Sequence, residues 1–128
     1  MAIANKQGNA LIQSNFMKYG KLKRSWQFER VYRDGNKYSD ELFVIYVLHN
    51  NTHEVRIGLT VTKKVGKSVQ RNRIKRVVRE VFRLLRAIMP GNDIVVVARK
   101  STVNLNYLQA QGSINSLLQK AHILKSQN

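Results

Sequence analysis

The chain of 128 residues contains no cysteine, one proline and only seven Asp and Glu residues. The absence of cysteine excludes a disulfide scaffold, a thiolate zinc site and a cysteine nucleophile. No run approaches the roughly 20 apolar residues that span a bilayer, and the N-terminus lacks a basic segment followed by an apolar run of signal-peptide type. We therefore expect a soluble cytoplasmic protein, with a length that suits one domain built around a hydrophobic core.

The scarcity of acids leaves 23 Lys and Arg residues with few counter-charges, so the formal net charge is +16. Such an excess repels itself in the compact state and favours a surface that is matched to a polyanion. The charge is concentrated, because residues 56–86 hold eleven basic residues and a single acid, Glu80. Apolar residues are interleaved with this charge, unlike in a disordered basic tail. The charge is therefore predicted to lie on folded structure, with nucleic acid as the first candidate partner and an anionic membrane surface as the second.

The hydrophobic pattern predicts the element order α-β-β-β-α-β-α, if residues 37–40 form a short first strand. Ser25 is expected to cap the first helix, and Gly35 to end it in a left-handed conformation. Strands over residues 41–48 and 55–62 flank a turn and predict an antiparallel hairpin. The remaining elements are a helix over residues 68–87, a buried strand over residues 93–99 and a C-terminal helix over about residues 105–121. We interpret this order as one α+β domain over residues 21–124, with a flexible extension over residues 1–20 and a short tail over residues 125–128.

The strand over residues 55–62 has two different faces. Apolar residues alternate with small, polar or cationic ones: Val55, Ile57, Leu59 and Val61 on one face, and Arg56, Gly58, Thr60 and Thr62 on the other. Since successive side chains point to opposite sides of a sheet, the apolar face belongs to the core and the other face is predicted to be open. Val44 and Tyr46, on the preceding strand, are expected to join that open face.

The helix over residues 68–87 also has two faces at helical spacing. An apolar face is formed by Ile74, Val77, Val78, Val81, Phe82 and Leu85, whereas the opposite face is almost uniformly cationic. Like charges four residues apart destabilise a free helix, and an anionic partner would offset that repulsion. In the preceding loop Gly66 permits a tight turn, and Ser68 is expected to cap the helix, whose first amides favour anions. This region is the strongest candidate for a nucleic-acid site.

Catalytic and metal-binding patterns are not found. Four of the seven acids, Asp34, Asp40, Glu41 and Glu54, lie near turns or strand ends and lack the paired, apolar setting that acid–base catalysis requires. His49 and His53 flank a turn without an evident third ligand, so a solvated turn is favoured over a metal site. We predict no catalytic residue and no metal ligand in this chain.

Residues 56–80, with the sequence RIGLTVTKKVGKSVQRNRIKRVVRE, closely resemble the signature of the bacterial ribonuclease P protein component. Arg71-Asn72-Arg73 matches the RNR motif of that family, and the resemblance extends over about residues 22–121. It implies an α-β sandwich with a left-handed βαβ crossover, of the kind also found in a ribosomal protein. It further implies a protein that assists a catalytic RNA subunit in removing the 5′ leader from precursor tRNA. The Mg²⁺ ions would be held by the RNA subunit and the substrate rather than by this chain, and neither a membrane nor a further protein partner is required.

The resemblance also implies two sets of binding residues. The RNA subunit would be bound by Lys63, Lys64, Lys67, Arg71, Asn72, Arg73, Lys75, Arg76 and Arg79. The single-stranded leader would lie in a cleft between the first helix and the sheet, against Phe28, Tyr32, Val44, Tyr46, Thr60 and Thr62, to which Arg56 is added because it shares their strand face. For Phe28 and Tyr32, ordinary core packing is the alternative to leader binding.

Three other functions stay open at this point. A ribosomal or general RNA-binding domain would carry a similar cationic helix. A protein-only nuclease is disfavoured by the dispersed acids, and a membrane-surface protein would need the apolar helix face that the core requires. The extension before Leu22 departs from the usual family pattern and has no assigned role.

Overall fold

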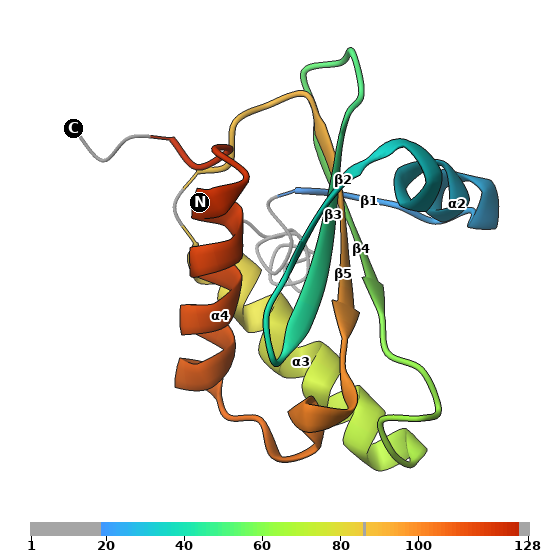
Figure 1. Cartoon of the computed structure of the whole chain (residues 1–128), viewed down its shortest axis with the longest axis vertical. Helices are drawn as coiled ribbons and strands as arrows, with labels where there is room; N and C mark the ends of the chain where they lie inside the picture. The colour runs from blue at the N-terminus through green and yellow to red at the C-terminus, as the bar shows by residue number, and fades with distance from the viewer. Residues whose placement is uncertain (1–18, 86, 126–128) are drawn as a thin grey trace, which may run out of the picture.

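A mixed five-stranded sheet with helices on both of its sides forms the protein in a computed structural model, which describes residues 19–85 and 87–125 (Figure 1). The predicted order of helices and strands is confirmed, with a short N-terminal strand and a 3-10 helix added to it. The elements are β1 (Gly20–Lys21), α2 (Ser25–Asp34), β2 (Asn36–Ser39), β3 (Phe43–His49), β4 (Val55–Thr60), α3 (Ser68–Leu84), β5 (Asn92–Ala98), the 3-10 helix η1 (Lys100–Asn104) and α4 (Tyr107–Lys120).

The strand order in the sheet is β1-β4-β5-β3-β2, so the predicted hairpin between β3 and β4 is wrong. β5 lies between these two strands, parallel to β4 and antiparallel to β3. Its residues Ile94, Val95 and Val96 are fully buried, and a strand that is apolar on both faces is most stable at the centre of a sheet. The βαβ unit that the family resemblance implies is formed by β4, α3 and β5.

The predicted sharing of one sheet face by β3 and β4 is nevertheless confirmed. Val95 is paired with Tyr46 on one side and with Gly58 on the other. Because residues directly opposite each other point to the same face of a sheet, these three share a face. Val44 and Thr60 are both paired with Val97 and lie on that face as well.

The main hydrophobic core lies on the other side of the sheet, which α3 and α4 cover (Figure 1). The apolar face predicted for α3 packs on this core: Ile74, Val78, Val81 and Phe82 are all at 2% exposure or less, Leu85 is buried, and Val77 is partly buried. On the opposite side, α2 packs across the sheet over a small second core of Leu22, Val31 and Val95. The surface formed by α2 is therefore separated by the sheet from the surface formed by α3 and α4.

The predicted helix caps differ from the observed ones. Arg24 and Lys67, rather than Ser25 and Ser68, are the N-cap residues. The backbone N–H of each donates to the side-chain oxygen of the glutamine three residues later, at 2.9 Å for Arg24 and 2.8 Å for Lys67. These glutamines satisfy the N-terminal backbone without any serine hydroxyl, because a Gln at the third helical position reaches back to the cap.

Gly35 is extended, with φ −79° and ψ 161°, so the predicted left-handed end of α2 is wrong. A glycine is required there for a different reason. A Cβ atom at this position would lie 2.6 Å from the carbonyl oxygen of Val31 and 3.0 Å from that of Val47. Gly35 thus allows the end of α2 to approach β3 closely.

Most of the predicted N-terminal extension, residues 1–18, lies outside the described residues, as do residues 126–128 of the predicted tail. Tyr19 and Gly20, which the prediction placed in the extension, pack against the domain. Gly20 pairs with Arg56, and the backbone N–H of Ile88 donates to the Tyr19 hydroxyl at 3.2 Å. Within residues 19–85 and 87–125, no helix is long and apolar enough to cross a membrane.

Candidate nucleic-acid interface

The predicted RNA-subunit-binding residues lie in the loop after β4 and on the solvent-accessible part of α3. We call this set of residues the cationic face. None of its nine residues is buried, since the α3 side chains that enter the core lie on the opposite side of the helix. Its members are Lys63, Lys64, Lys67, Arg71, Asn72, Arg73, Lys75, Arg76 and Arg79.

The single acid of this region is paired within its own helix turn and does not neutralise the cationic face. Arg83 donates from Nε to Glu80 Oε1 at 3.0 Å, and this hydrogen bond lowers the pKa of Glu80 below its ordinary value. Among the described residues, no ion pair involves any member of the cationic face. Its charges are therefore available to an external anion.

Both arginines of the RNR motif also hold neighbouring backbone. Arg71 donates from Nη1 to the carbonyl of Gly66 at 3.0 Å, which braces the loop before α3. Arg73 donates from Nη2 to the carbonyl of Leu105, the residue between η1 and α4. A guanidinium has five N–H donors, so each arginine keeps donors for a phosphate while its orientation is set by the protein.

Six of the seven predicted leader-binding residues gather on the α2 side of the sheet. We call this set the aromatic face: Phe28, Tyr32, Val44, Tyr46, Arg56 and Thr60. The Tyr32 and Tyr46 rings meet edge to face with centroids 5.0 Å apart, and the Tyr32 hydroxyl lies 2.9 Å from Thr60 Oγ1. Thr62 lies beyond the end of β4, in the exposed loop that leads to the cationic face.

Phe28 and Tyr32 differ in their surroundings, which bears on whether each serves core packing or leader binding. Phe28 is half-buried and packs against the small core of Leu22, Val31 and Val95. Its ring covers Gly58, where a Cβ atom would lie 2.5 Å from Phe28 Cε2. Tyr32 keeps 37% of its surface exposed. Phe28 therefore contributes to core packing at the border of this face, whereas Tyr32 is accessible to a ligand.

A buried ion pair that the sequence analysis missed fixes Arg56. Asp93 is fully buried on β5 and accepts from Arg56 Nε at 2.7 Å and Nη2 at 2.8 Å. It also accepts from Asn50 Nδ2 at 2.7 Å and from Arg30 Nη2, on α2, at 3.3 Å. The hydrogen bond to Asp93 raises the pKa of Arg56. The sequence signal for this ion pair was the acid at the start of the otherwise apolar run DIVVVA, because a buried carboxylate requires cationic partners.

Within the described parts of the chain, 19–85 and 87–125, no three His, Asp or Glu side chains lie close enough together to hold a metal ion. His49 and His53 are exposed at the turn after β3. Asp34 is hydrogen-bonded to Arg33 at the surface, and that bond lowers the pKa of the carboxyl. Asp34 thus belongs to a local ion pair at the surface.

An α+β fold that presents a cationic face without carboxylate partners among the described residues defines the class of protein, an RNA-binding protein. The family model for ribonuclease P matches residues 16–122. The chain belongs to the ribonuclease P protein component family.

Relatives and solved structures agree with this membership. The chain is 40% identical over 109 residues to the ribonuclease P protein component of Clostridium botulinum, covering 84% of this chain and 98% of that protein. It is 41% identical over 105 residues to that of Natranaerobius thermophilus, covering 81% and 91%. A Staphylococcus aureus RNase P protein mutant superposes with a TM-score of 0.80 at 34% identity, covering 91% and 99% of the two chains. The RNase P protein from Thermotoga maritima gives 0.70 at 29% identity, covering 78% and 96%.

Membership identifies the chain as a protein subunit of ribonuclease P, a ribonucleoprotein endoribonuclease that processes tRNA. Proteins of this family work together with the ribonuclease P RNA.

Proposed function

We propose that the protein binds the ribonuclease P RNA through the cationic face and guides the 5′ leader of precursor tRNA along the aromatic face. In this proposal the RNA subunit cleaves the substrate, and the Mg²⁺ ions are held by the RNA subunit and the substrate. The chain supplies no active site and needs no further protein partner, and it acts in the cytoplasm. The observation that carries the proposal is the cationic face itself, whose residues have no carboxylate partner in the described chain.

The position of the two faces supports a role between two RNAs. α3 and α2 lie on opposite sides of the sheet, and the loop after β4 leads from the sheet to α3 (Figure 1). A protein that places cations between two polyanions reduces their mutual repulsion. Less Mg²⁺ is then needed to bring the RNA subunit and its substrate together.

Reconstituted cleavage of precursor tRNA by the RNA subunit, measured over a range of Mg²⁺ concentrations, tests the proposal. Adding the protein should shift half-maximal cleavage to lower Mg²⁺. Arg76→Gln should reduce this shift, whereas Lys120→Gln, which removes an exposed charge from the end of α4, should leave it unchanged. The absence of any stimulation by the unmodified protein would refute the proposal.

The salt dependence of RNA-subunit binding gives a second measure of the cationic face. If about 6 phosphates are neutralised, counterion release predicts that the affinity falls on the order of a thousand-fold over a roughly fourfold rise in salt. A general RNA-binding domain would show the same slope with any structured RNA. Competition with an unrelated RNA of equal length separates the two functions, because only the proposed one prefers the ribonuclease P RNA.

The aromatic face is tested by Tyr46→Ala, with Phe28→Ala as a second variant. Loss of one stacked ring should weaken binding of leader-bearing precursor tRNA by about 1–3 kcal/mol. The affinity for the RNA subunit alone should stay the same, because α3 lies on the other side of the sheet. Equal losses for both RNAs would show that these rings serve only the core.

A second candidate function comes from one solved relative, the Staphylococcus aureus protein described as a mutant with defective mRNA degradation activity. Cleavage by the protein alone is therefore assayed with Mg²⁺ and an mRNA in the absence of the RNA subunit. The proposal above predicts no cleavage in that reaction. Cleavage that persists after removal of all contaminating RNA would favour the second candidate.

A further inference from the structure

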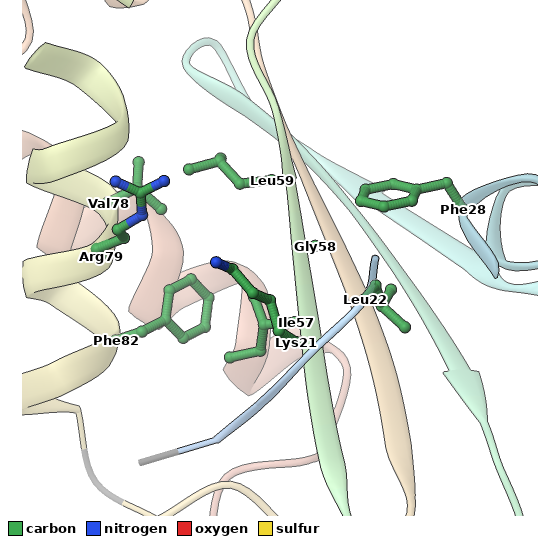
Figure 2. A pocket seen from close by; sticks show the side chains of 9 residues that line it. All are labelled: Lys21, Leu22, Phe28, Ile57, Gly58, Leu59, Val78, Arg79 and Phe82. Atoms are coloured by element: carbon green, nitrogen blue, oxygen red, sulfur yellow. The ribbon is translucent and has the colours of Figure 1, made fainter. Parts of the chain in front are cut away.

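A pocket of about 120 Å³ opens at the outer edge of β4, between the aromatic face and the cationic face (Figure 2). Apolar side chains from both sides of the sheet line it. Phe28 lies on one side of β4, whereas Phe82 and Arg79 reach toward the pocket from α3 on the other side (Figure 2). Lys21, at the end of β1, supplies a second cation. The pocket is thus an apolar space flanked by two positive charges.

The edge of β4 in this pocket has backbone groups without a strand partner. β1 pairs with β4 only at Arg56 and Ile57, and the Leu22 N–H donates to the Ile57 carbonyl at 3.0 Å. Because backbone groups alternate in direction along a strand, the Leu59 N–H and C=O face the same edge as those of Ile57. Within the described chain, no strand covers that edge beyond Ile57. Leu59 therefore presents one donor and one acceptor that pair with no described strand, beside the apolar walls.

We propose that this pocket binds one unpaired base of the 5′ leader, an inference that rests on the function proposed above. The ring of the half-buried Phe28 offers a contact to the flat face of a base, and the buried Phe82 forms part of the apolar wall behind it. The Leu59 N–H and C=O match the adjacent acceptor and donor on a Watson–Crick edge. Lys21 and Arg79 are placed to neutralise the phosphates on either side of that nucleotide. Three requirements of a single-stranded RNA site thus meet in one pocket.

The leader is the occupant that the geometry favours over a nucleotide of the RNA subunit. Phe28 belongs to both the aromatic face and the pocket, and its ring passes directly over Gly58 of β4. A strand of RNA that lies along the aromatic face therefore reaches the pocket at its neighbouring nucleotide.

The test measures the affinity of the holoenzyme for precursor tRNAs in which one leader nucleotide at a time lacks its base. A single position should lose at least about 5-fold in affinity, the lower limit for one base stacked on protein. Lys21→Gln should weaken binding of the intact leader, whereas Lys23→Gln, which removes an exposed charge that does not line the pocket, should not. A flat profile over all positions, in a substrate whose leader still increases affinity, would overturn the pocket and leave the proposed function standing. Loss of all leader-dependent affinity in the unmodified complex would instead overturn the proposed function.

Photo-crosslinking identifies the occupant directly. A 5-iodouridine at the sensitive leader position should crosslink to the peptide that contains Phe82, which is 2% exposed and lies on the opposite side of the sheet from the aromatic face. A crosslink from this position to Tyr32 or Tyr46 alone would show that the base stays on the aromatic face. A crosslink to Phe82 from a 5-iodouridine in the RNA subunit would assign the pocket to that RNA instead of the leader and overturn the inference.

Discussion

Removing the buried carboxylate of Asp93 should destabilise the protein strongly. Asp93 is fully buried and accepts four hydrogen bonds, from Arg56 twice, from Arg30 and from Asn50. Truncation of one partner of a buried ion pair costs about 3–5 kcal/mol, because the other charge is left without compensation. The side chains of Arg56 and Arg30 keep 22% and 35% of their surface exposed, so water relieves part of this penalty. We expect Asp93→Ala to lose about 3 kcal/mol, a large share of the roughly 5–15 kcal/mol that holds a domain together.

Urea denaturation measures this loss, and the chain provides its own probe. Trp26 is the only tryptophan, and the guanidinium of Arg30 lies 5.3 Å from the centroid of its ring. Fluorescence of Trp26 therefore reports both unfolding and any displacement of Arg30 in the folded variant. Asp34→Asn is the matched control, because its carboxyl pairs with Arg33 at the exposed surface, where such pairs contribute little.

The double variant Asp93→Leu with Arg56→Met separates the ion pair from general disruption of the sheet. It removes the charge and its main partner together, so it should be more stable than Asp93→Ala. Equal free energies of unfolding for Asp93→Ala and the Asp34→Asn control would refute the reasoning. So would a double variant that is less stable than Asp93→Ala.

Three further predictions concern single positions. Arg73→Ala should lower the free energy of unfolding by about 1–2 kcal/mol, since it leaves the Leu105 carbonyl unpaired. Arg76→Ala, in contrast, should only weaken RNA binding and reduce the slope of log affinity against log salt concentration by about 1. Equal free energies of unfolding for the two variants in urea titrations would contradict this. Gly35→Ala should destabilise the protein by about 1–3 kcal/mol, because the added Cβ atom would meet the Val31 carbonyl. Gly112→Ala in α4, where a Cβ atom meets nothing within 4 Å, should instead raise the thermal midpoint. A lowered midpoint for Gly112→Ala or an unchanged one for Gly35→Ala would contradict these contacts. Burial raises the pKa of Asp40, but hydrogen bonds from Ser113 and from the backbone of Phe43 and Leu42 outweigh it and lower the pKa overall. Its stabilisation is therefore present above the unfolded carboxyl pKa of about 4 and is lost as the pH falls through the lowered folded value, so the stability difference between the wild type and Asp40→Asn should shrink on acidification; a difference independent of pH would exclude this role.

The periodic parts of the sequence predicted the structure well. The two-residue alternation along β4 and the helical spacing along α3 depend only on the local chain, so their buried and exposed faces could be assigned from the sequence. For the same reason the sequence assigns the cationic face to the exposed side of α3 and the loop that precedes it. Tyr46 was assigned to the correct sheet face although its strand was paired wrongly, because pleating is independent of the neighbouring strand.

The errors concern interactions between segments that are distant in sequence. A turn between β3 and β4 favours a hairpin, but it does not exclude the insertion of a third strand. The fully apolar run of β5 indicated burial without indicating between which strands it lies. Asp93 was overlooked as a site residue because its partners Arg56 and Arg30 are brought to it only by that strand order. Gly35 was expected to adopt a left-handed conformation, whereas its role depends on how closely α2 approaches β3.

The central position of β5 determines when the protein can fold. A chain is synthesised from its N-terminus, so β3 and β4 are complete before β5 has been made. Val96 of β5, for example, pairs with both Ile45 of β3 and Leu59 of β4. Until then both strands have unpaired edges, which favour association with other chains. Pairing over such separations is also slow compared with local contacts. A fragment that ends before Asn92 would contain the whole cationic face but no strand to join β3 to β4, so α3 can be positioned only in a chain that has been completed through β5.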